Sequence, residues 1–276
     1  MPKRSHRGSL GKSSKRDNDI ITPDRYIAIG NRQSQTGNYP SALVAYDLAV
    51  KLAPNYADSY NYRGSFKYAH LGDIQGAVAD FDSAIGYDPD YAVAYANRGL
   101  VRYQQLGDIP GALADLNLAI LLNPRDASVY TTRGLIKYEL GDIEYAFADY
   151  DLAIASDPNF APAYNCRGLL KNVKLMDIVG ALADYDKAIA LAPYLSEAFY
   201  NRGTLKHREL GDPSGALADY NKAIDLDPHL AAAYFVRGLL KRDFLGDVLG
   251  AARDRHRAIS LQERSANALD PDLRVN

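Results

Sequence analysis

The sequence predicts an all-α fold made of seven pairs of antiparallel helices, stacked one after another as a solenoid. The first observation is an Arg-Gly pair that recurs along the 276 residues at intervals of 35, 35, 34, 35 and 35. The second is a proline that recurs with the same five intervals. Two independent marks in one register indicate a structural repeat. The pairs are Arg63-Gly64, Arg98-Gly99, Arg133-Gly134, Arg167-Gly168, Arg202-Gly203 and Arg237-Gly238, and the prolines are Pro54, Pro89, Pro124, Pro158, Pro193 and Pro228.

Each repeat is expected to contain two helices. The first begins shortly after the proline and ends at a Leu-Gly-Asp triplet such as Leu71-Gly72-Asp73. Glycine suits the left-handed residue that often follows a helix, and aspartate suits the N-cap of the next one. The second helix carries the pattern Ala-x-x-Asp-aromatic-x-x-Ala-Ile, as from Ala77 to Ile85. Its apolar residues have the spacing of one helical face, and the next proline ends it.

The repeats account for most of the chain. We expect them at residues 23–56, 57–91, 92–126, 127–160, 161–195, 196–230 and 231–265, between a disordered basic N-terminal tail at 1–22 and a C-terminal tail at 266–276. Neither tail is long enough for a catalytic domain. We therefore expect no enzyme activity and no catalytic, metal or cofactor site.

Three positions depart from the repeat pattern. Met176 replaces the glycine of the fifth turn, where a left-handed backbone would cost about 1 kcal/mol for a residue with a side chain. Arg255 replaces the large apolar residue of the seventh second helix, which predicts a charged outer face that nothing covers. No proline closes that helix, so it is expected to run on toward Leu269.

Charge is distributed unevenly. Residues 1–16 carry six basic side chains and no acidic one, so that removing them from the net charge of −2 leaves −8 for residues 17–276. The basic tail is interpreted as a solubilising end, and the alternatives are a tether to an acidic partner, a nucleic acid or an anionic membrane, or a transit peptide.

Cys166 is the only cysteine, and no stretch approaches the roughly 20 apolar residues of a membrane helix. These features favour a cytoplasmic protein, with an organellar lumen or stroma as the alternative.

The pattern of small and large residues resembles the tetratricopeptide repeat over residues 23–265. In the second repeat the small residues are Gly64, Ala77 and Ala84, the large residue is Phe81 and the closing proline is Pro89. Five repeats hold 35 residues instead of the family's usual 34, which predicts an extra residue in the turn between the helices. The Leu-Gly-Asp-x-x-Gly-Ala form looks like that of cyanobacterial and plastid members. The resemblance implies a right-handed superhelix and a non-catalytic scaffold or assembly factor.

The resemblance also implies that a concave groove, lined by the first helices, binds an unidentified protein or peptide. Its predicted lining is apolar and aromatic in the centre, with polar flanks, which suits a segment with hydrophobic anchors. Self-association is left open. The predicted groove residues are Asn61, Tyr68, Ala96, Leu100, Tyr103, Thr131, Leu135, Tyr138, Asn165, Leu169, Tyr200, His207, Phe235 and Leu239.

Two other kinds of ligand are weighed against a protein segment. Some family members clamp the acidic tail of chaperones with lysine at the second or fifth position of a first helix, and no repeat here has that lysine, although Asn97 and Asn201 match another part of the clamp. No chaperone-tail binding is therefore expected. RNA binding is the alternative function, since polar residues such as Asn61 and Thr131 could read bases. The acidic repeats argue against nucleic acid.

A ladder of charges accompanies the Arg-Gly pairs. Each arginine is followed four residues later by a second base, and each second helix carries an aspartate, as in Arg63, Lys67 and Asp80. The ladder is interpreted as internal ion pairs that tie helices together, because a feature present in every repeat usually serves the stacking of repeats. The alternative is a polyanion-binding track.

Overall fold

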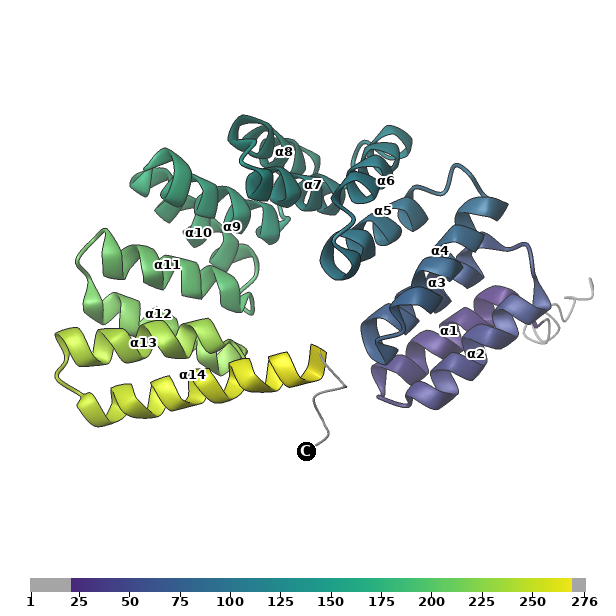
Figure 1. Cartoon of the computed structure of the whole chain (residues 1–276). Helices are drawn as coiled ribbons and strands as arrows, with labels where there is room; N and C mark the ends of the chain where they lie inside the picture. Colours follow the sequence, from purple (N-terminus) through teal and green to yellow (C-terminus); the bar gives the residue numbers. More distant parts are fainter. Residues whose placement is uncertain (1–20, 270–276) are drawn as a thin grey trace, which may run out of the picture. The chain divides into compact units, whose positions relative to one another are not determined.

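The computed structural model describes residues 21–269, and the side chains to residue 264. These residues form fourteen α-helices and no strand. Two compact units divide the chain, at residues 1–122 and 123–276, and each is a stack of antiparallel helix pairs (Figure 1). The predicted all-α class is confirmed. The predicted tails at 1–22 and 266–276 lie mostly outside the described residues.

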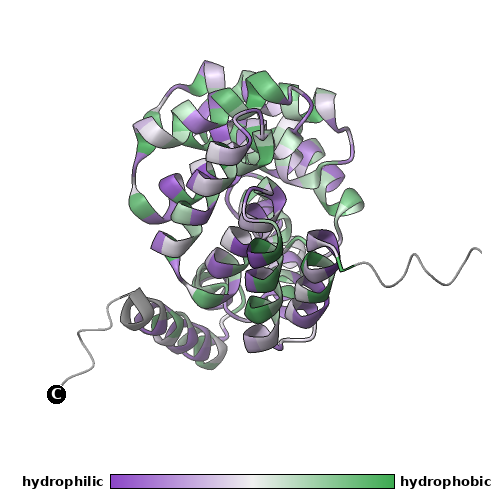
Figure 2. Cartoon of the chain, turned by 90° about the vertical axis from the view of Figure 1, so that its right-hand side faces the viewer, coloured by the Kyte–Doolittle hydropathy of each residue, from purple (hydrophilic) through white to green (hydrophobic). Residues whose placement is uncertain are grey.

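The first unit holds three helix pairs and the second holds four, numbered here as repeats one to seven. Polar and apolar residues alternate along individual helices (Figure 2). The first unit contains α1 (Pro23–Gln35), α2 (Tyr39–Leu52), α3 (Ala57–Phe66) with η1 (Lys67–Leu71), α4 (Ile74–Tyr87), α5 (Ala92–Val101) with η2 (Arg102–Leu106), and α6 (Ile109–Leu122). The second contains α7 (Ala127–Leu140), α8 (Ile143–Ser156), α9 (Ala161–Leu170) with η3 (Lys171–Leu175), α10 (Ile178–Leu191), α11 (Ser196–Arg208), α12 (Pro213–Leu226), α13 (Ala231–Phe244) and α14 (Val248–Leu269).

The extra residue of the longer repeats widens the last turn of the first helix. In repeat four, which has 34 residues, the Asp142 N–H donates to the carbonyl of Lys137, five residues earlier, at 2.9 Å. In the 35-residue repeats the bond spans six residues, as from the Asp73 N–H to the carbonyl of Lys67 at 3.2 Å. Three of these turns, η1, η2 and η3, are π-helical. In repeats two, three and five the link between the helices therefore keeps its two residues and the helix absorbs the insertion, whereas in repeats six and seven the link has four and three residues.

An aspartate caps most of the second helices, as predicted. The Gly76 N–H donates to Asp73 Oδ1 at 2.9 Å, and a Cβ on Gly76 would lie only 2.0 Å from Asp73 Oδ2. Glycine three residues after the aspartate therefore leaves room for the capping carboxylate in this position. Repeat four has Tyr145 at that position, and there Asp142 makes no side-chain cap.

The core between consecutive repeats is built on one large buried residue of each second helix. Tyr150 packs against Leu170 of the following repeat, and Tyr220 packs against Leu240. Within the repeat, the glycine of the Arg-Gly pair makes room for the large ring, since a Cβ on Gly134 would lie 2.6 Å from Tyr150 Cε1. Burying one such side chain stabilises the stack by about 1.5–3 kcal/mol.

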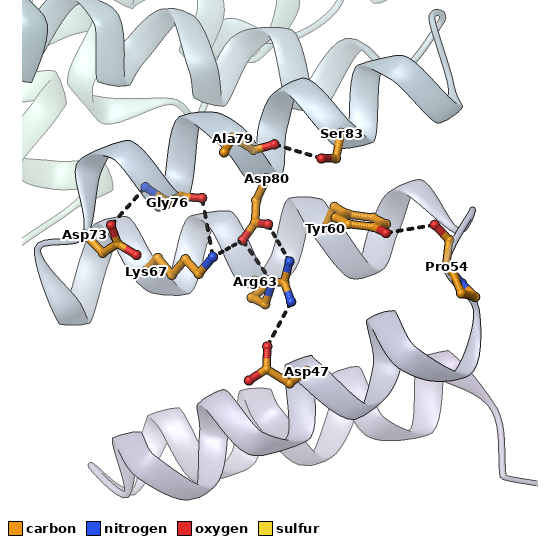
Figure 3. A network of polar contacts seen from close by, with 10 residues as sticks. All are labelled: Asp47, Pro54, Tyr60, Arg63, Lys67, Asp73, Gly76, Ala79, Asp80 and Ser83. Carbon is orange, nitrogen blue, oxygen red and sulfur yellow. Dashed lines mark hydrogen bonds and ion pairs between the residues drawn. The ribbon is translucent and has the colours of Figure 1, made fainter.

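The charge ladder is an internal network, as the sequence predicted (Figure 3). Arg63 donates to both carboxylate oxygens of buried Asp80, at 3.0 and 2.6 Å, and Lys67 pairs with the same carboxylate at 2.8 Å. Arg63 also reaches back to Asp47 of the preceding repeat at 2.8 Å. The same arginine–aspartate pair recurs in every later repeat, as Arg98–Asp115, Arg133–Asp149, Arg167–Asp184, Arg202–Asp219 and Arg237–Asp254.

The network shifts the ionisation of its members. Burial acts to raise the pKa of Asp254, but hydrogen bonds from Arg237 and Lys241 outweigh it and hold the pKa below its usual value. Hydrogen bonding to Asp115 raises the pKa of Arg98 in spite of burial. Both groups stay charged in the fold, which keeps the buried pairs intact.

The two unusual sequence positions have different outcomes. Met176 adopts the left-handed backbone, with φ of +56°, and is the only residue other than glycine with positive φ in the described part of the chain. α14 extends to Leu269, as expected. The expectation of a charged outer face on repeat seven is only partly met. Arg255 is exposed, but Phe235, Val248 and Ile259 are exposed beside it, because no described residue packs on this face.

Candidate protein-binding faces

The predicted groove residues all lie on the first helices of their repeats, five in the first unit and nine in the second. Most are half-buried, which leaves part of each side chain accessible to a ligand. Phe235 is 49% exposed. Asn61 and Thr131 are only 5% exposed, so these two residues have little surface to offer.

In the first unit, polar residues of neighbouring first helices bond to one another. The amide of Asn97 donates to Asn61 Oδ1 at 2.9 Å, which explains why Asn61 is buried. The Tyr68 hydroxyl donates to Gln104 Oε1 of the next repeat at 2.6 Å. These predicted groove residues therefore also hold repeats two and three together.

A cavity of about 330 Å³ lies between repeats one and two. It is lined by residues outside the predicted set, among them Tyr46, Tyr62, Phe66 and His70. His70 stacks on Tyr39, with ring centroids 4.7 Å apart. They were not predicted because Tyr46 lies on a second helix, while Tyr62, Phe66 and His70 lie at first-helix positions outside those that the resemblance assigns to the groove.

The second unit brings Leu169 and Tyr200 to one cavity of about 300 Å³. Asn172, Val173 and Thr204 also line it from the first helices of repeats five and six, and Tyr185 lines it from the second helix α10. The cavity is therefore bounded by apolar and aromatic groups, with amide and hydroxyl groups between them and the charged side chains of Arg208 and Glu209 beside them. Such a mixture is typical of sites that hold a ligand by shape and fix it with a few polar contacts.

Some polar side chains of this face already form hydrogen bonds within the protein. The Asn201 amide donates to Asn165 Oδ1 at 2.9 Å, and the Thr204 hydroxyl donates to the Tyr200 carbonyl at 2.9 Å. Burial, aided by nearby Arg208, lowers the pKa of His207, so His207 is neutral at pH 7. Its ring meets Phe244 of the next repeat edge-on, at 5.2 Å.

The described residues show no arrangement that activates a nucleophile. Burial and the charge of Glu197 raise the pKa of the Cys166 thiol to about 12, so the reactive thiolate is scarce. Within residues 21–269, no group of three or more His, Cys, Asp or Glu side chains forms a metal site. In the same range, no helix has both the length and the apolar composition needed to cross a membrane.

Comparison with known proteins identifies the repeats. Models of the tetratricopeptide repeat match residues 100–171 and 196–230. The matched stretches contain the fourth and sixth predicted repeats whole and parts of the third and fifth, while the cyanobacterial and plastid form stays a prediction. The comparison with functionally curated proteins finds no match.

Solved structures share the fold along most of the chain. A tetratricopeptide repeat protein from Parabacteroides merdae is 21% identical, with a TM-score of 0.65, over 87% of this chain and 93% of that one. A chain of the APC/C hetero-tetramer Cut9–Hcn1 is 17% identical, with a TM-score of 0.76, over 92% of this chain and 49% of that one. A monomeric mutant of IFIT1 with Gppp-AAAA is 13% identical, with a TM-score of 0.71, over 91% of this chain and 64% of that one. At these identities the likeness concerns the fold alone.

Proposed function

We propose that these tetratricopeptide repeats form a non-catalytic scaffold or assembly factor that binds a protein segment on the faces of its first helices. The observation that carries the proposal is the cavity beside Leu169 and Tyr200. It lies where the residue pattern predicted binding. Proteins of this repeat family act generally as interaction scaffolds, in keeping with the absence of an activated nucleophile among the described residues.

The cavity suits one apolar anchor of an extended or helical segment. Its volume of about 300 Å³ is at the lower end of ligand sites, enough for one or two large side chains. Leu169 and Val173 supply apolar contact, and Tyr200 supplies a large rigid surface. The side-chain carbonyl of Asn201 accepts no hydrogen bond from the described residues, so it is available to a backbone N–H of the segment.

RNA binding is supported less well. Phosphate binding needs unpaired bases along one face, but the arginines of the ladder are paired with buried aspartates in every repeat that has them. One structure of similar fold holds Gppp-AAAA, but that ligand belongs to a protein 13% identical. The fold is therefore compatible with either ligand, and the pairing of the charges favours protein.

Peptides selected from a random library on the full chain test the proposal. Their affinities are then measured for wild type, Leu169→Arg and Val179→Arg. Leu169 lines the cavity, whereas Val179 is 82% exposed on the second helix α10 and serves as the matched control. We expect Leu169→Arg to weaken binding at least tenfold, since a charge replaces an apolar wall, and Val179→Arg to change it less than twofold.

Circular dichroism must show that both variants fold. Peptides that bind Leu169→Arg as tightly as wild type would contradict the proposed site. If both substitutions abolish binding of the peptides, the binding face would lie elsewhere in the fifth repeat.

A further inference from the structure

A third cavity lies on the outer face of repeat seven, between α13 and α14, which run side by side (Figure 1). Its volume is about 350 Å³, and its lining is mostly apolar. Leu239 and Ala251 lie among its walls, with Phe235, Val248, Arg255 and Ile259. It lies on a different pair of helices from the cavity of the proposed function.

The preceding repeat shows what covers this place elsewhere in the chain. In repeat six, Val236 and Leu240 of the following helix α13 pack on the corresponding residues, Ala216 and Tyr220. The covering helix thus presents two aliphatic residues four positions apart. Ile224 is 8% exposed under that cover, whereas its counterpart Ile259 is 43% exposed in repeat seven. The outer face of repeat seven therefore resembles a surface on which a helix packs in repeat six, but no described helix covers it.

The charges of this face differ from those of the earlier repeats. There the residue after the large buried one is an aspartate or an asparagine that accepts a hydrogen bond from the arginine of the incoming helix, as Asp151 does from Arg167, Asp186 from Arg202 and Asn221 from Arg237, each at 2.7 Å. In repeat seven that position is His256, and Arg255 precedes it. Over residues 248–264, four arginines stand against one aspartate and one glutamate. A helix that carries the chain's own arginine would meet like charge here.

We propose that this face binds an amphipathic helix of a partner protein that bears aliphatic residues at positions i and i+4 and an acidic residue at i+1. The aliphatic pair fills the places that Val236 and Leu240 occupy one repeat earlier. The acidic residue takes the place of Arg237, whose partner Asn221 corresponds to His256, and Arg255 precedes His256 on the same helix.

A second copy of the chain fits this face poorly. Its first helix, α1, has the small residue Ala28 and the charged residue Arg32 at the positions that Val236 and Leu240 occupy in α13. Arg32 would then enter the cavity beside Arg255, and bringing two like charges together in a partly buried site costs several kcal/mol. The charge pattern therefore favours a partner with an acidic helix.

Two stapled helical peptides test the proposal against the full chain. The basic probe copies residues 231–244, and the acidic probe is the same peptide with Arg237→Glu. We expect the acidic probe to bind wild type at least about tenfold more tightly than the basic one, with an advantage that shrinks at high salt. The double variant Arg255→Glu/His256→Glu should reverse the preference, and Leu169→Arg should leave it unchanged. Both changed side chains in the double variant are exposed, so the fold is expected to tolerate them.

Other outcomes overturn the proposal. Equal binding of the two probes, or a preference that survives the double variant, would mean that these charges do not select the partner. Binding of the acidic probe only after removal of residues 270–276 would mean that the chain's own end occupies the face. A dimer that dissociates on Arg255→Glu would assign the face to a second copy. Because Leu169→Arg affects only the first-helix cavity, failure here is distinguishable from failure of the proposed function.

Discussion

At the scale of single residues, Met176 is where sequence and backbone conflict. Its φ of +56° belongs to the left-handed region, and its side chain is 68% exposed, so that packing recovers little of the cost. The equivalent residues of the other turns, such as Gly72 and Gly211, are glycines with φ of +64° and +60°. Met176 therefore keeps the turn because the helices on both sides hold it.

Met176→Gly is expected to stabilise the protein. Removing the side chain relieves the left-handed strain and raises the free energy of unfolding by about 1 kcal/mol, measured by urea denaturation. The matched control is Gly72→Ala, where a Cβ would meet no atom within 4 Å, so that only the backbone strain is added. It should lower stability by about 1 kcal/mol. A neutral Met176→Gly alongside a destabilising Gly72→Ala would show that the fifth turn is not strained.

At the scale of the helices, one arginine links three elements. Arg202 on α11 pairs with Asp219 on α12 at 2.6 Å and with Asp186 on α10 at 2.7 Å. It therefore joins the two helices of its own repeat and also joins that repeat to the preceding one. Asp219 is 4% exposed, so these partners take the place of water around its carboxylate.

Arg202→Ala should destabilise the protein by about 2 kcal/mol. Loss of one partner from a buried ion pair costs about 3–5 kcal/mol, and Lys206, which pairs with Asp219 at 2.8 Å, offsets part of the loss. Thermal and urea unfolding measure the effect. The control is Arg242→Ala, which removes an exposed pair with Asp243 and should leave the melting temperature unchanged. Equal effects of the two substitutions would mean that the ladder does not tie the helices together.

The helix pairs could be predicted because their signals are local. A glycine, an aspartate cap and a proline mark most of the boundaries, and the glycine that leaves room for the capping carboxylate stands three residues away in sequence. The widened turns were predicted only as an extra residue between helices. Whether an insertion lengthens a loop or widens a helix depends on hydrogen bonds such as Asp73 to Lys67, which residue spacing does not reveal.

At the scale of the whole molecule, the candidate binding faces were predictable only in part. Leu169 and Tyr200 meet at one cavity because both lie on the expected faces of successive first helices. Asn61 is nearly buried where the Asn97 amide donates to it, and only the contact between repeats decides such burial. The apolar cavity of repeat seven was missed because Arg255 alone suggested a closed, charged face.

Removing the basic N-terminal tail should abolish retention on heparin. Residues 1–16 hold six bases, residues 17–276 carry a net charge of −8, and the ladder arginines are paired internally. A variant that begins at residue 21 should therefore pass through a heparin column at about 150 mM salt, while any retention of the full chain should fall steeply with salt. Circular dichroism of both chains confirms that the helices are unchanged. A truncated chain that still binds at moderate salt would show that the repeats themselves attract polyanions, and the RNA-binding function would then replace the protein scaffold as the better proposal.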